Sequence, residues 1–177
     1  MRIISGTHKG RKIMAPKNLP SRPTTDMAKE ALFNILNNRY YFDELKVLDL
    51  YSGIGSISFE FASRGTTSIT AVDKHRGCVK FIAETAELLD LPIQVVADDA
   101  MKFIKRNRSS YTIIFADPPY KNDVSIFLEL VDIVFDNNLL EDGGTLIVEH
   151  SKHTVLAEHK RHIQTKTYGG SSFSFFE

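Results

Sequence analysis

The residues with the clearest chemical potential are Asp117-Pro118-Pro119-Tyr120, which follow a short run of apolar, strand-forming residues. Two consecutive prolines continue neither a strand nor a helix, so they would aim the Asp117 carboxylate and a backbone carbonyl at one point. Two converging acceptors suit an exocyclic amine and favour its pyramidal, nucleophilic form, while the Tyr120 ring can stack on a planar base. The segment predicts a catalytic site for a nucleobase amine; the alternative is a tight turn after a buried strand.

A glycine-containing loop, Asp49-Leu50-Tyr51-Ser52-Gly53-Ile54-Gly55, follows an earlier strand-like run. Its glycines permit a tight turn and a close approach to a ligand, and ligands of open α/β sheets bind beyond the carboxyl ends of the strands. Asp73 ends the next apolar run, where a carboxylate can accept both hydrogen bonds of a ribose diol. Dinucleotide and adenosyl sites share these features, and the alternative is a glycine turn that binds no ligand.

The residues at positions 49 and 58 separate these two ligand classes. A nicotinamide fingerprint has a third glycine at its sixth position, where this chain has Ser58. Asp49 would repel a pyrophosphate but attract a cation, and S-adenosylmethionine carries both an α-amino group and a sulfonium. An S-adenosylmethionine site is therefore expected. Because the sulfonium already activates the methyl group of this cofactor, correct orientation of the acceptor would provide much of the catalysis.

The remaining polar residues give weaker signals. Asp98-Asp99-Ala100 follow a third strand-like run, where a carboxylate could accept from the adenine amine, although Asp there more often caps a helix. The six histidines show no metal-ligand spacing on one helix face, so no metal is expected. There is no P-loop and no nucleophile elbow. Cys78 is the only cysteine, which excludes a disulfide framework and a Cys-rich zinc site.

The elements that would position these residues alternate between short apolar strands and helices. Strands are expected over about 46–51, 68–72, 93–96, 111–116 and 145–149, with helices between them and one more over about 26–37. The alternation predicts right-handed βαβ units and a mostly parallel, Rossmann-like sheet covered on both faces. Gly169-Gly170 then separate two extended runs, over about 161–168 and 171–177, which predict a β-hairpin. This hairpin would add an antiparallel strand to the sheet and bring the total to seven strands.

The distribution of charge divides the chain. It has 177 residues with 22 basic and 22 acidic side chains, so its formal net charge is zero. The first 25 residues carry six of the basic residues and no acid, which leaves the rest with a net charge of −6. We expect a basic N-terminal β-hairpin arm over 1–25, pairing 2–5 with 11–14, and an α/β domain over 26–177. No signal-peptide or membrane-span pattern is present, so a cytoplasmic protein is expected.

The loops at 49–55 and 117–120 together resemble those of Rossmann-like class I methyltransferases that use S-adenosylmethionine to modify amino groups. Three N-terminal blocks narrow this resemblance to the RsmD family, the bacterial 16S rRNA guanine-N2 methyltransferases. The blocks are Arg2-Ile3-Ile4-Ser5-Gly6, Lys9-Gly10-Arg11-Lys12 and Arg22-Pro23-Thr24-Thr25-Asp26. The similarity extends from residue 2 to about residue 150. The family often has Ala-Gly-Ser-Gly where this chain has Ser52-Gly53-Ile54-Gly55, which keeps both glycines.

The resemblance implies a cofactor, an acceptor and a set of site residues. The cofactor would be S-adenosylmethionine, and the acceptor would be the N2 amine of one guanine in 16S rRNA, within small ribosomal subunit particles. Asp117, Pro118, Pro119 and Tyr120 would position that amine. The implied cofactor-binding residues are Thr24, Thr25, Asp49, Ser52, Gly53, Gly55, Asp73, Lys74, Asp99 and Ala100. A monomer is expected, with no metal and no membrane partner.

Basic side chains would hold the RNA, because phosphate contacts orient an enzyme without reading bases. The arm offers Arg2, Lys9, Arg11, Lys12 and Arg22, and Lys102, Lys105, Arg106 and Arg108 form a second candidate strip. Two other functions stay open. An adenine-N6 DNA methyltransferase is disfavoured because 177 residues leave little room for a sequence-reading domain. A non-catalytic RNA-binding module is disfavoured by the intact segment 117–120.

Overall fold

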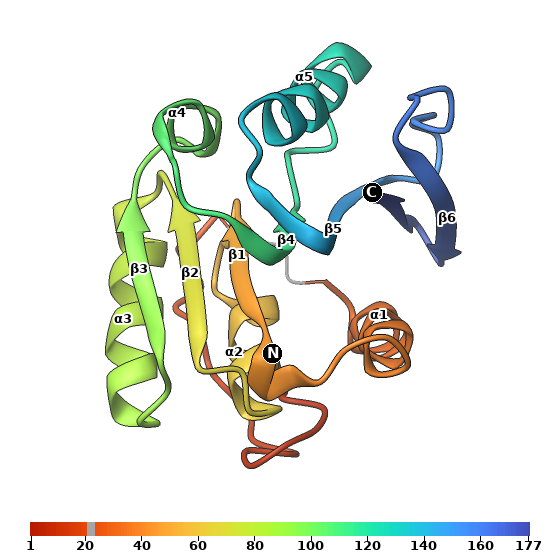
Figure 1. Cartoon of the computed structure of the whole chain (residues 1–177). Helices are drawn as coiled ribbons and strands as arrows, with labels where there is room; N and C mark the ends of the chain where they lie inside the picture. Colours follow the sequence, from red (N-terminus) through yellow and green to blue (C-terminus); the bar gives the residue numbers. More distant parts are fainter. Residues whose placement is uncertain (21–23) are drawn as a thin grey trace.

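The computed structural model describes residues 1–20 and 24–177, and its strands form one sheet (Figure 1). The strands are β1 (Lys46–Leu50), β2 (Ser68–Asp73), β3 (Ile93–Ala97), β4 (Tyr111–Ala116), β5 (Leu140–Ser151), β6 (His162–Tyr168) and β7 (Ser171–Phe176). The sheet has seven strands in the order β3-β2-β1-β4-β5-β7-β6. Strands β1 to β5 pair in parallel, whereas β7 is antiparallel to both of its neighbours. The predicted mostly parallel sheet with a C-terminal hairpin is confirmed.

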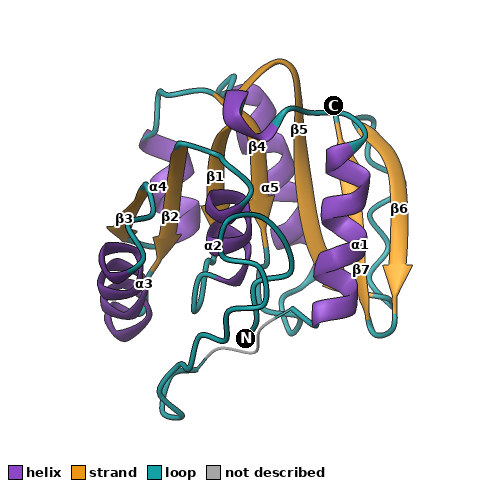
Figure 2. Ribbon diagram, turned by 90° about the horizontal axis from the view of Figure 1, so that it is seen from below, coloured by secondary structure: helices purple, strands orange, loops and turns teal. Residues whose placement is uncertain are grey.

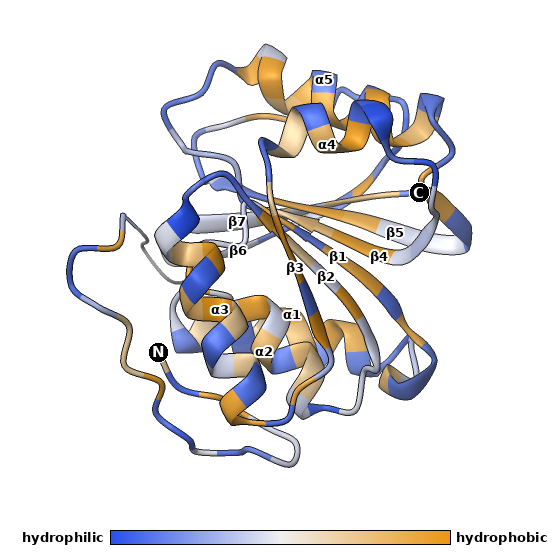
Figure 3. Ribbon diagram, turned by 90° about the vertical axis from the view of Figure 1, so that its left-hand side faces the viewer, coloured by the Kyte–Doolittle hydropathy of each residue, from blue (hydrophilic) through white to orange (hydrophobic). Residues whose placement is uncertain are grey.

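Helices cover both faces of this sheet (Figure 3). On one face lie α1 (Asp26–Asn37), α2 (Ser56–Ser63) and α3 (Arg76–Leu88), and on the other lie α4 (Ala100–Arg106) and α5 (Val124–Asp136). A 3-10 turn, η1 (Phe42–Glu44), precedes β1. Thr25 caps α1 by accepting a hydrogen bond from the Ala28 N–H, as its residue type predicts. Within the described residues, no helix is both long enough and apolar enough to cross a membrane.

The alternation of side chains along β1 explains how an acid comes to lie beneath α2. Leu48 and Leu50 are buried in the cluster that α4 and α5 form with the sheet. Val47 points the other way, into the cluster under α1 and α2. Because successive side chains of a strand point to opposite faces, Asp49 lies on the Val47 side, toward α2.

Strand β5 is longer than the predicted segment 145–149, because two glycines distort the strand without ending it. The register against β4 shifts between Tyr111 and Ile113, and Gly143 has φ +75°. A Cβ atom on Gly144 would lie 2.9 Å from the carbonyl oxygens of Glu141 and Thr112. Glycines at an irregularity of this kind re-aim a strand rather than stop it.

The N-terminal segment (residues 1–20) lies against α2 and α3 (Figure 2). Ile3 and Ile13 are buried there, in a cluster that includes Phe59 and Ile82. The predicted hairpin is present in part: backbone hydrogen bonds join residues 1–3 to residues 10–13 around one bridge, between residues 2 and 12, but the pairing does not extend to two full strands. The pairing is short because the backbone N–H groups of residues 4 and 5 donate to a side chain of α2 instead of to the opposite arm of the hairpin.

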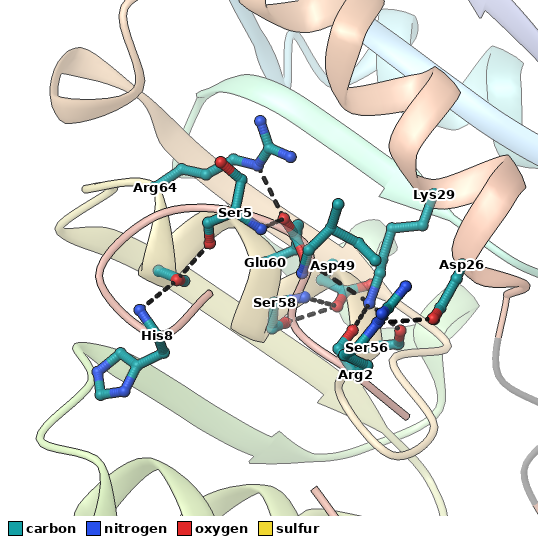
Figure 4. Close-up of polar contacts among 12 residues, drawn as sticks. Arg2, Ser5, His8, Asp26, Lys29, Asp49, Ser56, Ser58, Glu60 and Arg64 are labelled. Carbon is teal, nitrogen blue, oxygen red and sulfur yellow. Dashed lines mark hydrogen bonds and ion pairs between the residues drawn. The ribbon is translucent and has the colours of Figure 1, made fainter. Parts of the chain in front are cut away.

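Glu60 of α2 accepts those donors (Figure 4). Its carboxylate is fully buried, and it accepts hydrogen bonds from the N–H groups of Ile4 at 2.8 Å and Ser5 at 3.0 Å. Arg64 Nε lies 2.9 Å from the same carboxylate. A buried charge is tolerated when it is paired and hydrogen-bonded, so Glu60 fixes the N-terminal segment on α2.

Lys29 of α1 completes this buried network (Figure 4). Its side chain is 1% exposed, and its ammonium lies 3.6 Å from the Glu60 carboxylate. It also donates to the Arg2 carbonyl at 2.7 Å and to Ser56 Oγ at 3.3 Å. Burial lowers the pKa of Lys29, and the Glu60 charge opposes that shift. Lys29 therefore joins the N-terminal segment, α1 and the start of α2.

Candidate active site

A cleft of about 580 Å³ lies at the carboxyl ends of the parallel strands. This is the edge at which open α/β sheets bind ligands, and the volume suits a small-molecule cofactor. Ten of the sequence-predicted site residues line it: Thr24, Thr25, Gly53, Asp73, Lys74, Ala100, Asp117, Pro118, Pro119 and Tyr120. Asp49 and Ser52 line a small cavity of about 30 Å³ that shares Thr24, Gly53 and Asp117 with the cleft. The structure thus brings the two predicted loops together.

Gly55 and Asp99 are absent from the residues that line either cavity. Gly55 has φ +78°, and a Cβ atom there would lie 2.9 Å from the Phe59 ring and 3.0 Å from Ile82. It therefore shapes the loop by permitting close packing. Asp99 caps α4 by accepting a hydrogen bond from the Lys102 N–H at 3.1 Å, which is the common role for Asp at a helix start.

Asp73 connects the loop after β1 with the loop after β2, and both loops line the cleft. One carboxylate oxygen accepts from the Gly53 N–H at 2.8 Å, and the other accepts from the His75 N–H at 2.7 Å. A carboxylate has about four acceptor positions. Two acceptor positions therefore remain, so Asp73 can still bind a ligand diol in the cleft that it lines.

Asp49 is an acid held in a buried position. It is 1% exposed and accepts from the Ser58 N–H at 3.1 Å and from Ser58 Oγ at 2.5 Å. Burial raises its pKa to about 7, although the two Ser58 hydrogen bonds oppose the shift. Ser58 was noted in the sequence only because it replaces the third glycine of a nicotinamide fingerprint. In the structure, it stabilises the Asp49 carboxylate through two hydrogen bonds. Such an environment favours a cationic ligand, which would restore the ionised form.

Ser52 supplies the clearest sign that a ligand can bind here. Its Oγ is buried and has no hydrogen-bond partner within the described part of the chain. Buried hydroxyl groups are almost always paired. A ligand group at the Asp49 end of the cavities would satisfy it.

The segment 117–120 presents an acid and an aromatic ring to the cleft. Desolvation raises the pKa of Asp117 well above its ordinary value, and the charges of Glu149 and Asp49 raise it further. The Tyr120 hydroxyl donates to Glu149 Oε1 at 2.9 Å. Glu149 was not among the predicted site residues. One feature of the sequence could have identified it: like Asp49, Asp73 and Asp117, it is an acid near the carboxyl end of a parallel strand.

The predicted RNA-binding residues have different environments. Lys9, Arg11 and Lys12 are exposed. Arg2 pairs with Asp26 at 3.1 Å, so its charge is partly used, and Arg22 lies outside the described residues. In the second candidate strip, Lys105 pairs with Glu129 at 2.8 Å and Arg106 pairs with Asp98 at 2.6 Å. Among the residues that the structure describes, the arm therefore carries more unpaired positive charge than the strip does.

Across residues 1–20 and 24–177, no group of three or more His, Cys, Asp and Glu side chains is arranged to hold a metal ion. The arrangement in the cleft instead combines buried acids, an unpartnered hydroxyl and an aromatic ring. Chemically, it suits a ligand that carries a cationic group and hydroxyl donors, with a planar amine beside it.

Comparisons with known proteins show which proteins the chain is similar to. The family model "Conserved hypothetical protein 95" matches residues 1–177. Ribosomal RNA small subunit methyltransferase D of Escherichia coli K12 is 31% identical over 150 residues, which cover 84% of this chain and 74% of that protein.

Two solved structures from Thermus thermophilus also resemble the chain. One, a hypothetical protein, has TM-score 0.85 and 28% identity, over 100% of this chain and 99% of its own. The 16S rRNA N2 G1207 methyltransferase, solved with AdoMet and guanosine, has TM-score 0.70 and 20% identity, over 90% of this chain and 45% of its own, and shows the fold alone. The family match over the whole chain and the likeness to the Escherichia coli enzyme lead to one conclusion: the chain belongs to the RsmD family of ribosomal RNA small subunit methyltransferases.

Proposed function

We propose that this protein transfers a methyl group from S-adenosylmethionine to the N2 amine of a specific guanine in 16S rRNA of small ribosomal subunit particles in the cytoplasm. One observation carries the proposal. The cleft brings the Asp117–Tyr120 segment, which suits a nucleobase amine, beside the Gly53 loop and Asp73, which suit an adenosyl ligand. The name of the similar Escherichia coli enzyme supports the RNA substrate.

The residues present fit S-adenosylmethionine. Asp49 and Ser52 would hold its methionine end, because one is a buried acid and the other a buried hydroxyl that has no partner within the described chain. Asp73 would accept from the ribose hydroxyls, and Ala100 lines the cleft where the adenine would lie. When bound, the cofactor supplies a methyl group that its sulfonium already activates for transfer.

The chain's own residues would prepare the acceptor. The amine of guanine is a poor nucleophile because its lone pair is delocalised into the ring. Asp117 and a backbone carbonyl of the Pro118-Pro119 segment would accept its two hydrogen bonds and localise the lone pair, while the Tyr120 ring would stack on the base. Asp117 can also take the proton that the amine releases, because its raised pKa makes it a stronger base than an ordinary carboxylate.

The direct test is to incubate the protein with methyl-labelled S-adenosylmethionine and, in parallel, small ribosomal subunits, naked 16S rRNA and duplex DNA. Nucleoside digestion of each product then identifies the methylated base. Label in N2-methylguanosine from rRNA is expected. Label in N6-methyladenosine from DNA would replace the proposal with the alternative enzyme, and RNA binding without label would replace it with a binding module.

Cofactor affinity should depend on pH through Asp49. In the free protein, this carboxyl has a pKa of about 7, so a large fraction is protonated below that value. A cationic ligand favours the ionised form, so affinity should rise with pH, by up to about eightfold between pH 6 and pH 7.5. Calorimetric titration at several pH values measures this. Asp49→Asn should remove most of the pH dependence of the affinity. The control, His75→Asn, changes another titratable residue lining the cleft and should retain that dependence. Identical slopes in the wild type and both variants would contradict the assignment of the pH dependence to Asp49.

The exposed arm residues should set the strength of RNA binding but not the chemistry. Thr7 and His8 hydrogen-bond to Ser63 at the end of α2, whereas the start of α2 faces the site, so Lys9 lies roughly the 12 Å length of α2 from the cleft. Joint substitution of Lys9, Arg11 and Lys12 by Ala should raise KM for the RNA substrate about tenfold or more at low salt and reduce its salt dependence. The Kd of S-adenosylmethionine should stay unchanged. Deletion of the segment is a poorer test because Ile3 and Ile13 belong to the core.

A further inference from the structure

Glu149 of β5 is a buried carboxylate in the cleft wall. It is 2% exposed and lines the cleft. Its two oxygens have different partners: Oε1 accepts from the Tyr120 hydroxyl at 2.9 Å, and Oε2 accepts from Thr24 Oγ1 at 2.8 Å. One side chain therefore links the segment that would hold the base to the segment that precedes α1.

The Tyr120 hydroxyl has a second partner in β7. Ser171 Oγ lies 2.8 Å from it, so the far end of the tyrosine is fixed by two strands. Tyr120 is nevertheless 38% exposed, which leaves part of the side chain accessible from the cleft. A ring anchored in this way loses little further freedom when a base stacks on it.

Glu149 is a buried acid without a cationic partner among the described residues. None of the ion pairs found among the described residues involves it, so hydroxyl groups alone stabilise the carboxylate. A buried acid without a cation lowers stability, and such a cost is typical of functional sites. Its like charge also acts on Asp117, the group beside the proposed amine.

We propose that Glu149 is a positioning residue for methyl transfer: through Tyr120 it fixes the surface on which the acceptor base stacks, and through Thr24 it holds the lining segment that precedes α1. This role rests on the proposed function, since it concerns the same acceptor subsite. Glu149 touches neither reacting atom; it acts through the residues that do.

Kinetics of a small set of variants test this inference. Glu149→Ala should lower kcat for methylation of small subunits about tenfold or more, and should change the Kd of S-adenosylmethionine by less than about threefold. Glu149→Gln, which can still accept from one hydroxyl and donate to the other, should recover most of kcat. Tyr120→Phe should lower kcat by itself but add little in the Glu149→Ala background. Glu141→Ala, at an exposed acid of the same strand, is the matched control and should match the wild type.

The pH profile separates this role from a purely structural one. Asp117 faces the charges of Glu149 and Asp49, and Asp73 and His75 line the same cleft. Glu149→Gln removes only one of these charges, so the acidic limb of the kcat profile should move to lower pH. An unmoved limb together with additive effects of Glu149→Ala and Tyr120→Phe would overturn the inference. Full activity of Glu149→Ala would overturn it alone, whereas no transfer by the wild-type protein would overturn the proposed function as well.

Discussion

Replacement of Asp117 by Ala is expected to lower the rate of methyl transfer by at least about a hundredfold while S-adenosylmethionine still binds. The variant loses the acceptor that would localise the lone pair of the amine and the base that would take its proton. Single-turnover reactions with labelled cofactor and saturating small subunits measure the rate of the chemical step. A wild-type rate would refute the role given to Asp117.

Stability measurements would distinguish a loss of catalysis in this variant from a loss of folding. Desolvation and two neighbouring acids raise the pKa of Asp117, so the folded state holds its proton more tightly than the unfolded state does. Between the ordinary pKa of an aspartate and this raised value, stability therefore falls as pH rises, because the unfolded state binds fewer protons. Asp117→Asn should accordingly unfold at or above the wild-type temperature at pH 8. A markedly lower unfolding temperature would mean that the acid serves the fold.

Glu60→Ala is expected to reduce the free energy of unfolding by about 3–5 kcal/mol, a large part of the stability of a domain of this size. The substitution leaves the Lys29 ammonium buried without its carboxylate and removes the acceptor for the Ile4 and Ser5 N–H groups. Urea unfolding followed by far-ultraviolet circular dichroism measures the change, since the chain contains no tryptophan.

An exposed ion pair provides the control for that experiment. Lys80 and Glu84 lie 3.6 Å apart on α3, with side chains 75% and 65% exposed. Glu84→Ala should change stability by less than about 0.5 kcal/mol. If the two variants lost similar amounts, the buried network would not hold the N-terminal segment as described. Glu60→Gln should fall between them because an amide oxygen can still accept from the backbone.

The sheet could be predicted from the sequence because its signals are local. Short apolar runs ending in Gly, Asp or Pro mark β1, β2 and β4, and the handedness of βαβ units then orders them. The same rule predicts that acids at the carboxyl ends of these strands meet at one edge. Asp49, Asp73 and Asp117 were found for this reason, and the cleft with its adjoining cavity contains all three.

What could not be predicted depends on contacts between residues far apart in the chain. The short N-terminal pairing follows from Glu60, 55 residues beyond Ser5, which takes donors that a hairpin would have used. The link from Glu149 to Thr24 spans 125 residues. Ser58 has a role only because the pleat of β1 turns Asp49 toward α2. No period or motif within one segment contains this information.

The position of β7 between β5 and β6 has a consequence for the order of synthesis. Strand β5 leaves the ribosome before β7, so the edge formed by Leu146, Ile147 and Val148 stays unpaired until residues 171–176 emerge. At ordinary translation rates this interval lasts about 1 to 5 s. An apolar strand with a free edge invites pairing with other chains. The nascent protein is therefore exposed to aggregation until β7 arrives, and the same strand brings Ser171 to Tyr120.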